Sequence, residues 1–88
     1  MFPELLDGAK VLLYTVFGNY AYVRYTTGDI FNAVNYFAVC QYKNDDDFYL
    51  FGCNAYFEVI SDYICKNVEE CQELVQSFSC EKLHWSSF

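Results

Sequence analysis

Residues 67–78 read NVEECQELVQSF, and this stretch decides the fold because it holds the strongest helix signal in the chain. Its apolar residues recur at spacings of three and four, which places them on one stripe of a helix. Asn67 is suited to cap the helix, and Glu70 follows three residues later in the capping-box position. The sequence therefore predicts a C-terminal helix whose apolar stripe consists of Val68, Cys71, Leu74, Val75 and Phe78.

The region before this helix is rich in β-branched and aromatic residues and is broken at short intervals by turn signals. This pattern predicts an antiparallel meander sheet of four to five strands, at residues 11–17, 20–26, 35–43, 48–53 and 57–62. Gly18-Asn19 predicts a tight hairpin turn between the first two strands. With the C-terminal helix packed on one face of the sheet, the fold class is α+β. Eighty-eight residues provide for a single domain, 1–88.

The expected strands carry apolar side chains on both faces, whereas a half-buried strand has one polar face. One helix covers only one face of such a sheet, so the other needs a partner subunit, a binding protein or the N-terminal segment. We therefore expect an exposed, partner-binding face that bears Tyr14, Tyr20 and Tyr22 and that is covered either by a second copy of the chain, giving a homodimer, or by another protein. The expected core consists of Val11, Leu13, Val23, Val39, Leu50, Phe51, Val59, Val68, Leu74, Val75 and Phe78.

The net charge of −7 and the sequence pI of about 4.3 bear on possible partners. The five basic residues are scattered singly, whereas binding to a phosphate backbone calls for clustered Lys and Arg, so direct nucleic-acid binding is not expected. An acidic surface is instead attracted to a basic protein partner. The candidate partner-binding acids are Asp45, Asp46, Asp47, Asp62, Glu69, Glu70 and Glu73.

Other chemistry has little support. The acidic start of the chain is unlike a secretory signal, and its uncharged stretches are too short to cross a bilayer. Without a secretory signal, an odd number of cysteines, five, indicates reduced thiols and a cytoplasmic location.

The spacing of Cys65, Cys71, Cys80 and His84 does not match a zinc site, and we expect no metal and no cofactor. We expect no enzyme activity either.

Several segments between residues 36 and 85 together resemble a pattern in small bacterial proteins, some of which are similar to immunity proteins. They are YFAVCQY at residues 36–42, FYLFGCN at 48–54, VISD at 59–62 and VEEC at 68–71, followed by Trp85. The resemblance implies a small acidic antidote that caps a cognate toxin, often a nuclease, in the producing cell.

The sequence thus predicts a non-catalytic acidic binding protein, and an immunity protein that occludes a basic active-site surface is the leading hypothesis. One alternative is a phage or viral inhibitor whose carboxylates imitate the charge of nucleic acid. A second alternative is a small enzyme that uses Cys80 and His84.

Overall fold

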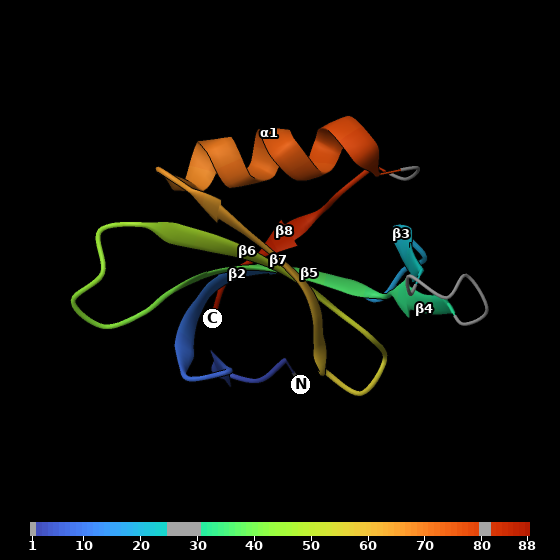
Figure 1. The fold of residues 1–88 in the computed structure, drawn as a ribbon, viewed down its shortest axis with the longest axis horizontal. Helices are drawn as coiled ribbons and strands as arrows, with labels where there is room; N and C mark the ends of the chain where they lie inside the picture. The colour runs from blue at the N-terminus through green and yellow to red at the C-terminus, as the bar shows by residue number, and fades with distance from the viewer. Residues whose placement is uncertain (1, 25–30, 80–81) are drawn as a thin grey trace.

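The computed structural model describes residues 2–24, 31–79 and 82–88. Within these residues the chain forms antiparallel strands and one C-terminal helix, which confirms the α+β class (Figure 1). The main sheet has the order β1-β2-β5-β6-β7, with β8 also paired to β2, while β3 and β4 form a separate two-stranded sheet. The elements are β1 (Leu5–Leu6), β2 (Ala9–Thr15), β3 (Ala21–Arg24), β4 (Phe31–Val34), β5 (Tyr36–Gln41), β6 (Phe48–Cys53), β7 (Val59–Cys65), α1 (Val68–Phe78) and β8 (Trp85–Ser86).

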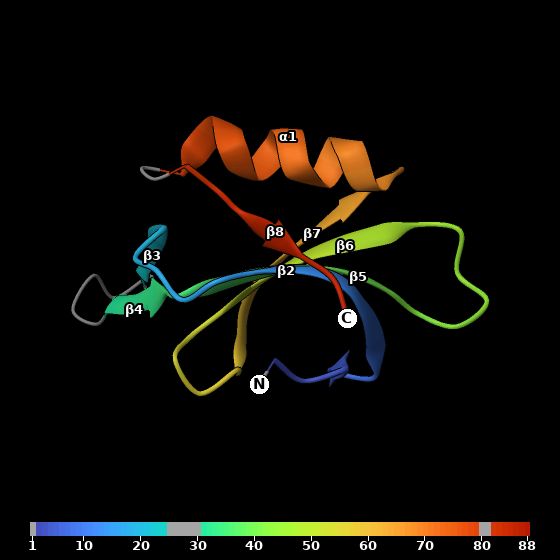
Figure 2. The same cartoon turned by 180° about the vertical axis from the view of Figure 1, so that it is seen from behind.

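The main sheet is curled into a half-barrel, which corrects the expectation of a simple meander. In both views, β2 and β7 bend away from α1, so that the sheet is convex toward the helix (Figures 1 and 2). Register shifts occur between Val11 and Leu13 on β2 and between Val59 and Ser61 on β7, opposite Cys53 and Gly52 of β6. Such bulges bend a strand and increase its twist.

The predicted hairpin at Gly18-Asn19 is wrong. Strand β2 pairs with β5 rather than with β3, and β3 pairs with β4. The chain leaves the main sheet at Gly18, which is bound by Asn35. Asn35 Nδ2 donates to the Gly18 carbonyl oxygen at 2.8 Å, and the Asn35 carbonyl oxygen accepts from the Gly18 N–H at 3.0 Å. Gly18-Asn19 therefore leads the chain out of the sheet instead of turning it back.

The helix forms at the position that the local sequence predicts. Asn67 Oδ1 accepts a hydrogen bond from the Glu70 N–H at 2.8 Å, so the predicted N-cap is confirmed. Cys71 and Val75, on the stripe facing the sheet, are fully buried. The helix has 11 residues, and in the described part of the chain no helix is long and apolar enough to span a membrane.

One hydrophobic core lies between α1 and the sheet. Along the strands, its residues alternate with residues whose side chains point to the other face of the sheet. Phe37 and Val39 of β5 and Leu50 of β6 point toward the helix. Thr15, although polar, is buried, and its Oγ1 accepts a hydrogen bond from the Phe37 N–H at 2.9 Å. The buried members of this helix-side core are Tyr20, Val34, Phe37, Val39, Leu50, Cys65, Cys71, Val75 and Leu83.

The other face of the sheet encloses a second core around Phe2, in the N-terminal segment. The Phe2 ring stacks on Tyr14 with centroids 4.6 Å apart and meets Tyr36 and Phe57 edge-on at 5.4 Å and 5.2 Å. The N-terminal segment, one of the three possible covers named for this face, therefore packs against it. The buried members of this N-terminal-side core are Phe2, Leu6, Ala9, Val11, Ala38, Cys40, Phe51 and Cys53.

The expected core is partly confirmed. Its fully buried members are Val11, Val39, Leu50, Phe51 and Val75. Four further members are partly buried and pack against one of the two cores, namely Leu13, Val59, Val68 and Leu74. The side chains of Val23 and Phe78 lie outside the described part of the structure.

Candidate protein-binding surface

The turn between β5 and β6 presents three consecutive aspartates, and its shape is set by their own hydrogen bonds. Asp45 Oδ1 accepts from the Asp47 N–H at 2.9 Å, and Asp45 Oδ2 accepts from the Tyr49 hydroxyl at 3.1 Å. Asp46 is exposed. The hydrogen bond to Asp45, together with desolvation and the nearby negative charges, raises the pKa of Tyr49 above its ordinary value. The turn is therefore ordered and electronegative.

The second acidic segment lies at the start of α1. Glu69 and Glu70 are in the first turn of the helix, and Glu73 follows one turn later; all three side chains are exposed. Carboxylates at this end of a helix are stabilised by the unpaired N–H groups and the positive end of the helix dipole. These side chains are thus accessible to a partner.

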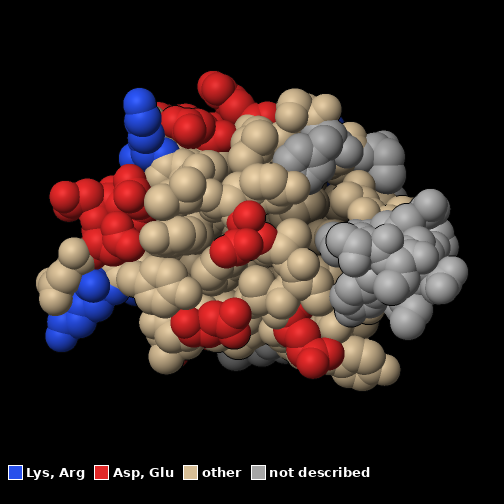
Figure 3. Space-filling view, in the orientation of Figure 1, with Lys and Arg blue, Asp and Glu red and all other residues tan. Residues whose placement is uncertain are grey.

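Strand pairing brings the two acidic segments to one end of the molecule. The β6–β7 register places Phe48 opposite Cys65, so the turn before β6 lies beside the connection from β7 to α1. Asp47 and Glu70 consequently line the same hollow, of about 210 Å³, together with Ile64, Cys65 and Lys66. In Figure 3 acidic side chains gather at this end of the helix and on the adjoining turn. We call this the acidic surface; it consists of Asp45, Asp46, Asp47, Glu69, Glu70 and Glu73.

Two of the expected partner-binding residues lie elsewhere. Asp62 is exposed on β7, but it pairs with Phe51, whose side chain belongs to the N-terminal-side core, so it points to the sheet face opposite α1. Tyr22, with 67% of its surface exposed, lies on β3, outside the main sheet. Neither is part of the acidic surface.

The expectation that Tyr20 contacts a partner is corrected. Its side chain is only 2% exposed and packs in the helix-side core, with its ring centroid 5.7 Å from that of Phe37. Its hydroxyl donates to the Val16 carbonyl oxygen at 2.6 Å. Tyr14, on the face that prompted the homodimer prediction, is stacked on Phe2. That face is therefore largely occupied by the chain's own aromatic residues.

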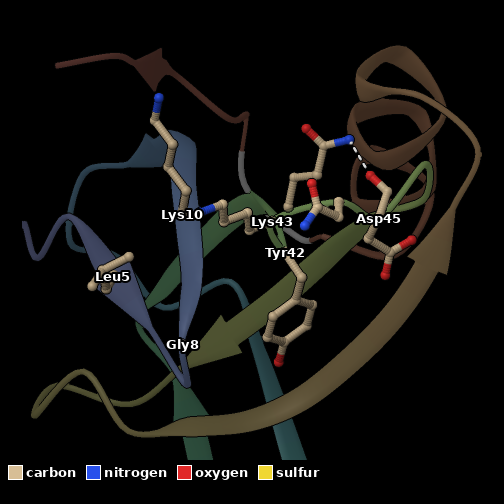
Figure 4. A pocket seen from close by; sticks show the side chains of 8 residues that line it. Leu5, Gly8, Lys10, Tyr42, Lys43 and Asp45 are labelled. Atoms are coloured by element: carbon tan, nitrogen blue, oxygen red, sulfur yellow. Dashed lines mark hydrogen bonds between the residues drawn. The ribbon is translucent and has the colours of Figure 1, made fainter.

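A groove on the other side of the aspartate turn has a different character. It has a volume of about 490 Å³ and is lined by Lys10 and Lys43 together with parts of the β1–β2 and β5–β6 turns. In Figure 4 the Asp45 carboxylate points away from both lysines, and the Asp45 carbonyl accepts from Gln41 Nε2 at 2.8 Å. The acidic surface is thus bounded on this side by two cations.

The described cysteines are all buried, and burial makes three of them poor nucleophiles. Cys40, Cys53, Cys65 and Cys71 are free and buried. Burial raises the pKa of Cys40 and of Cys53 to about 12 and also raises the pKa of Cys71, so these thiols are protonated at neutral pH.

The Cys80–His84 pair, and the Cys/His series that the sequence analysis rejected as a zinc site, fall partly outside the described residues because they include Cys80; His84 is exposed. Among the residues with described positions, no group of three or more His, Cys, Asp or Glu side chains could hold a metal ion.

Two exposed apolar side chains on β7 were missed by the sequence analysis. Tyr63 is 45% exposed and Ile64 61% exposed. The expected strand ended at Asp62, whereas β7 continues to Cys65. The signal for the longer strand was present, because an aromatic and a β-branched residue follow Asp62 directly.

Comparison of the chain with models of protein families, with curated proteins and with solved structures finds no match. The acidic surface and the side chains around it are therefore the features from which a function can be inferred.

Proposed function

We propose that this chain is a non-catalytic acidic binding protein, and that it acts as an immunity protein in the cytoplasm of the producing cell. Its partner is a cognate toxin, with a nuclease as the leading class. The observation that carries the proposal is the meeting of two acidic segments, more than twenty residues apart in the sequence, around one hollow that contains Asp47 and Glu70.

The physical basis is electrostatic complementarity. A nuclease must attract a phosphate backbone, so its active-site cleft is basic. A surface with six carboxylates at one end of a protein of net charge −7 has the opposite sign and would speed the encounter with such a cleft. The exposed apolar side chain of Ile64 lines the hollow that also contains Asp47 and Glu70, and it can supply the desolvated contact that charges alone do not provide.

The proposal is tested with the product of a toxin gene neighbouring the gene for this chain. The two proteins are mixed, and complex formation and inhibition of the toxin's nuclease activity are measured at low and high salt. Asp46→Lys reverses one exposed charge on the acidic surface. Glu4→Lys makes the same change in net charge at an exposed site next to β1, at the opposite edge of the main sheet.

We expect Asp46→Lys to slow association on the order of tenfold at low salt and Glu4→Lys to have a much smaller effect. An equal effect of the two variants would mean that only net charge matters and would contradict a defined acidic surface. Failure of the wild-type chain to bind any toxin encoded beside it would refute the proposed function.

A further inference from the structure

The two edges of the main sheet are protected to very different degrees. The outer edge of β2 is covered at both ends, because β1 pairs with Ala9 and Lys10, and β8 pairs with Tyr14 and Thr15. At the opposite edge, β7 runs for seven residues and pairs on its outer side with no segment among the described ranges (Figure 1). The backbone N–H and C=O groups of such an edge are a template for an additional strand.

The second half of β7 carries exposed side chains on both faces of the sheet. Asp62, Tyr63 and Ile64 are consecutive and all exposed, and successive side chains in a strand point to opposite faces. Natural edge strands are usually protected by charged side chains, Pro, a bulge or a covering segment. The exposed Asp62 is such a charge, and it opposes pairing with an acidic strand but not with a basic one. Here the register shift lies near the start of β7, opposite Cys53, and leaves the stretch from Asp62 to Ile64 regular.

Side chains along this edge define what a pairing strand would need. Asp62 and Ile64 lie on the same face, two residues apart, and Ile64 lines the hollow that also contains Asp47 and Glu70. Directly opposite side chains in an antiparallel pair favour opposite charges and apolar contacts. A strand pairing with β7 is therefore favoured by a Lys or Arg opposite Asp62 and an apolar residue opposite Ile64.

A second copy of this chain fits the edge poorly. Antiparallel pairing of two β7 strands centred on Asp62 would place the two Asp62 carboxylates opposite each other, which is destabilising. Centring the pair on Tyr63 would place each Asp62 opposite the partner's Ile64, with no cation available to either carboxylate. Each copy also carries a net charge of −7. Charge complementarity thus favours a basic partner over self-association.

We propose that β7 is the site at which the protein partner docks, by adding an extended basic segment to the free edge of the sheet. The segment pairs with residues 59–65 through backbone hydrogen bonds, places a Lys or Arg opposite Asp62 and packs an apolar side chain on Ile64. This inference rests on the proposed function for its partner, a basic protein, and adds the mode of binding.

The first test uses two synthetic heptapeptides of equal charge, one alternating Lys with Val and the other alternating Lys with Pro. Only the Lys-Val peptide can form a strand, because proline has no N–H to donate. In NMR titrations of the isotope-labelled protein, we expect the Lys-Val peptide to shift the amide signals of residues 59–65 and to slow exchange of some of these amides on the order of tenfold. Equal effects of the two peptides, or no change at residues 59–65, would overturn the proposal.

The second test uses variants against the cognate toxin. Ile64→Lys is compared with Val16→Lys, because Val16 is also β-branched and is 55% exposed on a different part of the surface. Far-ultraviolet circular dichroism and chemical denaturation establish that both variants fold. We expect Ile64→Lys to weaken toxin binding roughly tenfold or more, from lost apolar burial, and Val16→Lys to leave it unchanged.

The outcomes separate the two proposals. If Asp46→Lys weakens toxin inhibition while Ile64→Lys does not, the immunity function stands and docking on β7 is wrong. If no neighbouring toxin binds but the Lys-Val peptide protects β7, docking of a basic strand stands and the immunity function is wrong. A dimer of the wild-type chain in sedimentation experiments that Ile64→Lys dissociates would assign the edge to a second copy and overturn this inference.

Discussion

Replacing Phe2 with alanine tests how the concave face of the sheet, which is the face opposite α1, is covered. Phe2 is 7% exposed and contacts the rings of Tyr14, Tyr36 and Phe57 with centroid distances of 4.6 to 5.4 Å. Removing the ring would leave these three aromatic side chains without their common neighbour. The backbone around it should stay in place, because the Val11 N–H donates to the Glu4 carbonyl oxygen at 2.9 Å.

The expected cost follows from the burial of the ring. Phe-to-Ala substitutions in protein cores cost about 3–5 kcal/mol, and a site near a chain end belongs at the lower end of that range because the segment can partly collapse. A loss of about 3 kcal/mol corresponds to a fall in Tm of about 12–24 °C for a domain of this size. Such a loss is a large part of the total stability of a small domain.

Chemical denaturation gives the change in the free energy of unfolding, and binding of an apolar fluorescent dye reports on the uncovered face. Phe88→Ala is the matched control, because Phe88 also contacts Tyr14, at 5.1 Å, but is mostly exposed. We expect Phe2→Ala to bind dye and to self-associate in sedimentation experiments, and the control to change stability by less than about 1 kcal/mol. A Phe2→Ala protein that loses less than about 1 kcal/mol and binds no dye would refute this account of the concave face.

Three further substitutions or conditions have defined outcomes. Asn67→Ala removes the helix cap and should cost about 1 kcal/mol in chemical denaturation; no measurable loss would contradict the capping role. Gly52→Ala places a methyl group against Ser61 Oγ and should cost about 1–3 kcal/mol, part of which a second substitution, Ser61→Gly, should recover. The raised thiol pKa values of Cys40 and Cys53 contribute stability that is fully present below the unfolded pKa of about 9 and is lost as pH rises toward 12. The free energy of unfolding should therefore be lower at pH 10 than at pH 8, by on the order of 1 kcal/mol for each of these thiols. Cys40→Ala should reduce this difference, and equal stabilities at the two pH values would contradict burial of the thiols.

Features governed by local interactions could be predicted from the sequence. The capped helix starts at Val68 because Asn67 and the acidic first turn act within a few residues of each other. The turns after β5 and β6 also form where expected, since Asn54 Oδ1 accepts from the N–H groups of Tyr56 and Glu58 within a single loop. Side-chain to backbone hydrogen bonds of this kind depend on neighbouring residues and hence on the local sequence.

Features governed by long-range pairing could not be predicted. The turn signal at Gly18-Asn19 was interpreted as a hairpin because it lies between two runs of strand-forming residues. The partner that displaces the hairpin is Asn35, seventeen residues away from Gly18, and nothing in the local pattern identifies it. The same error placed Tyr20 on a strand of the main sheet, whereas it occupies the core beside Phe37.

The way the concave face is covered also decides where a partner can bind. Apolar residues on both faces of the strands suggested that one whole face was reserved for another molecule, but the curl of the sheet and the ring of Phe2 leave little of that face accessible. Some of the exposed apolar side chains lie at the outer edge of the sheet, where Tyr63 and Ile64 are exposed on β7. Because β7 runs directly into α1, this edge continues into the acidic surface. An apolar strand edge next to clustered carboxylates favours a partner that is both extended and basic, and it argues against a second copy of a chain with a net charge of −7.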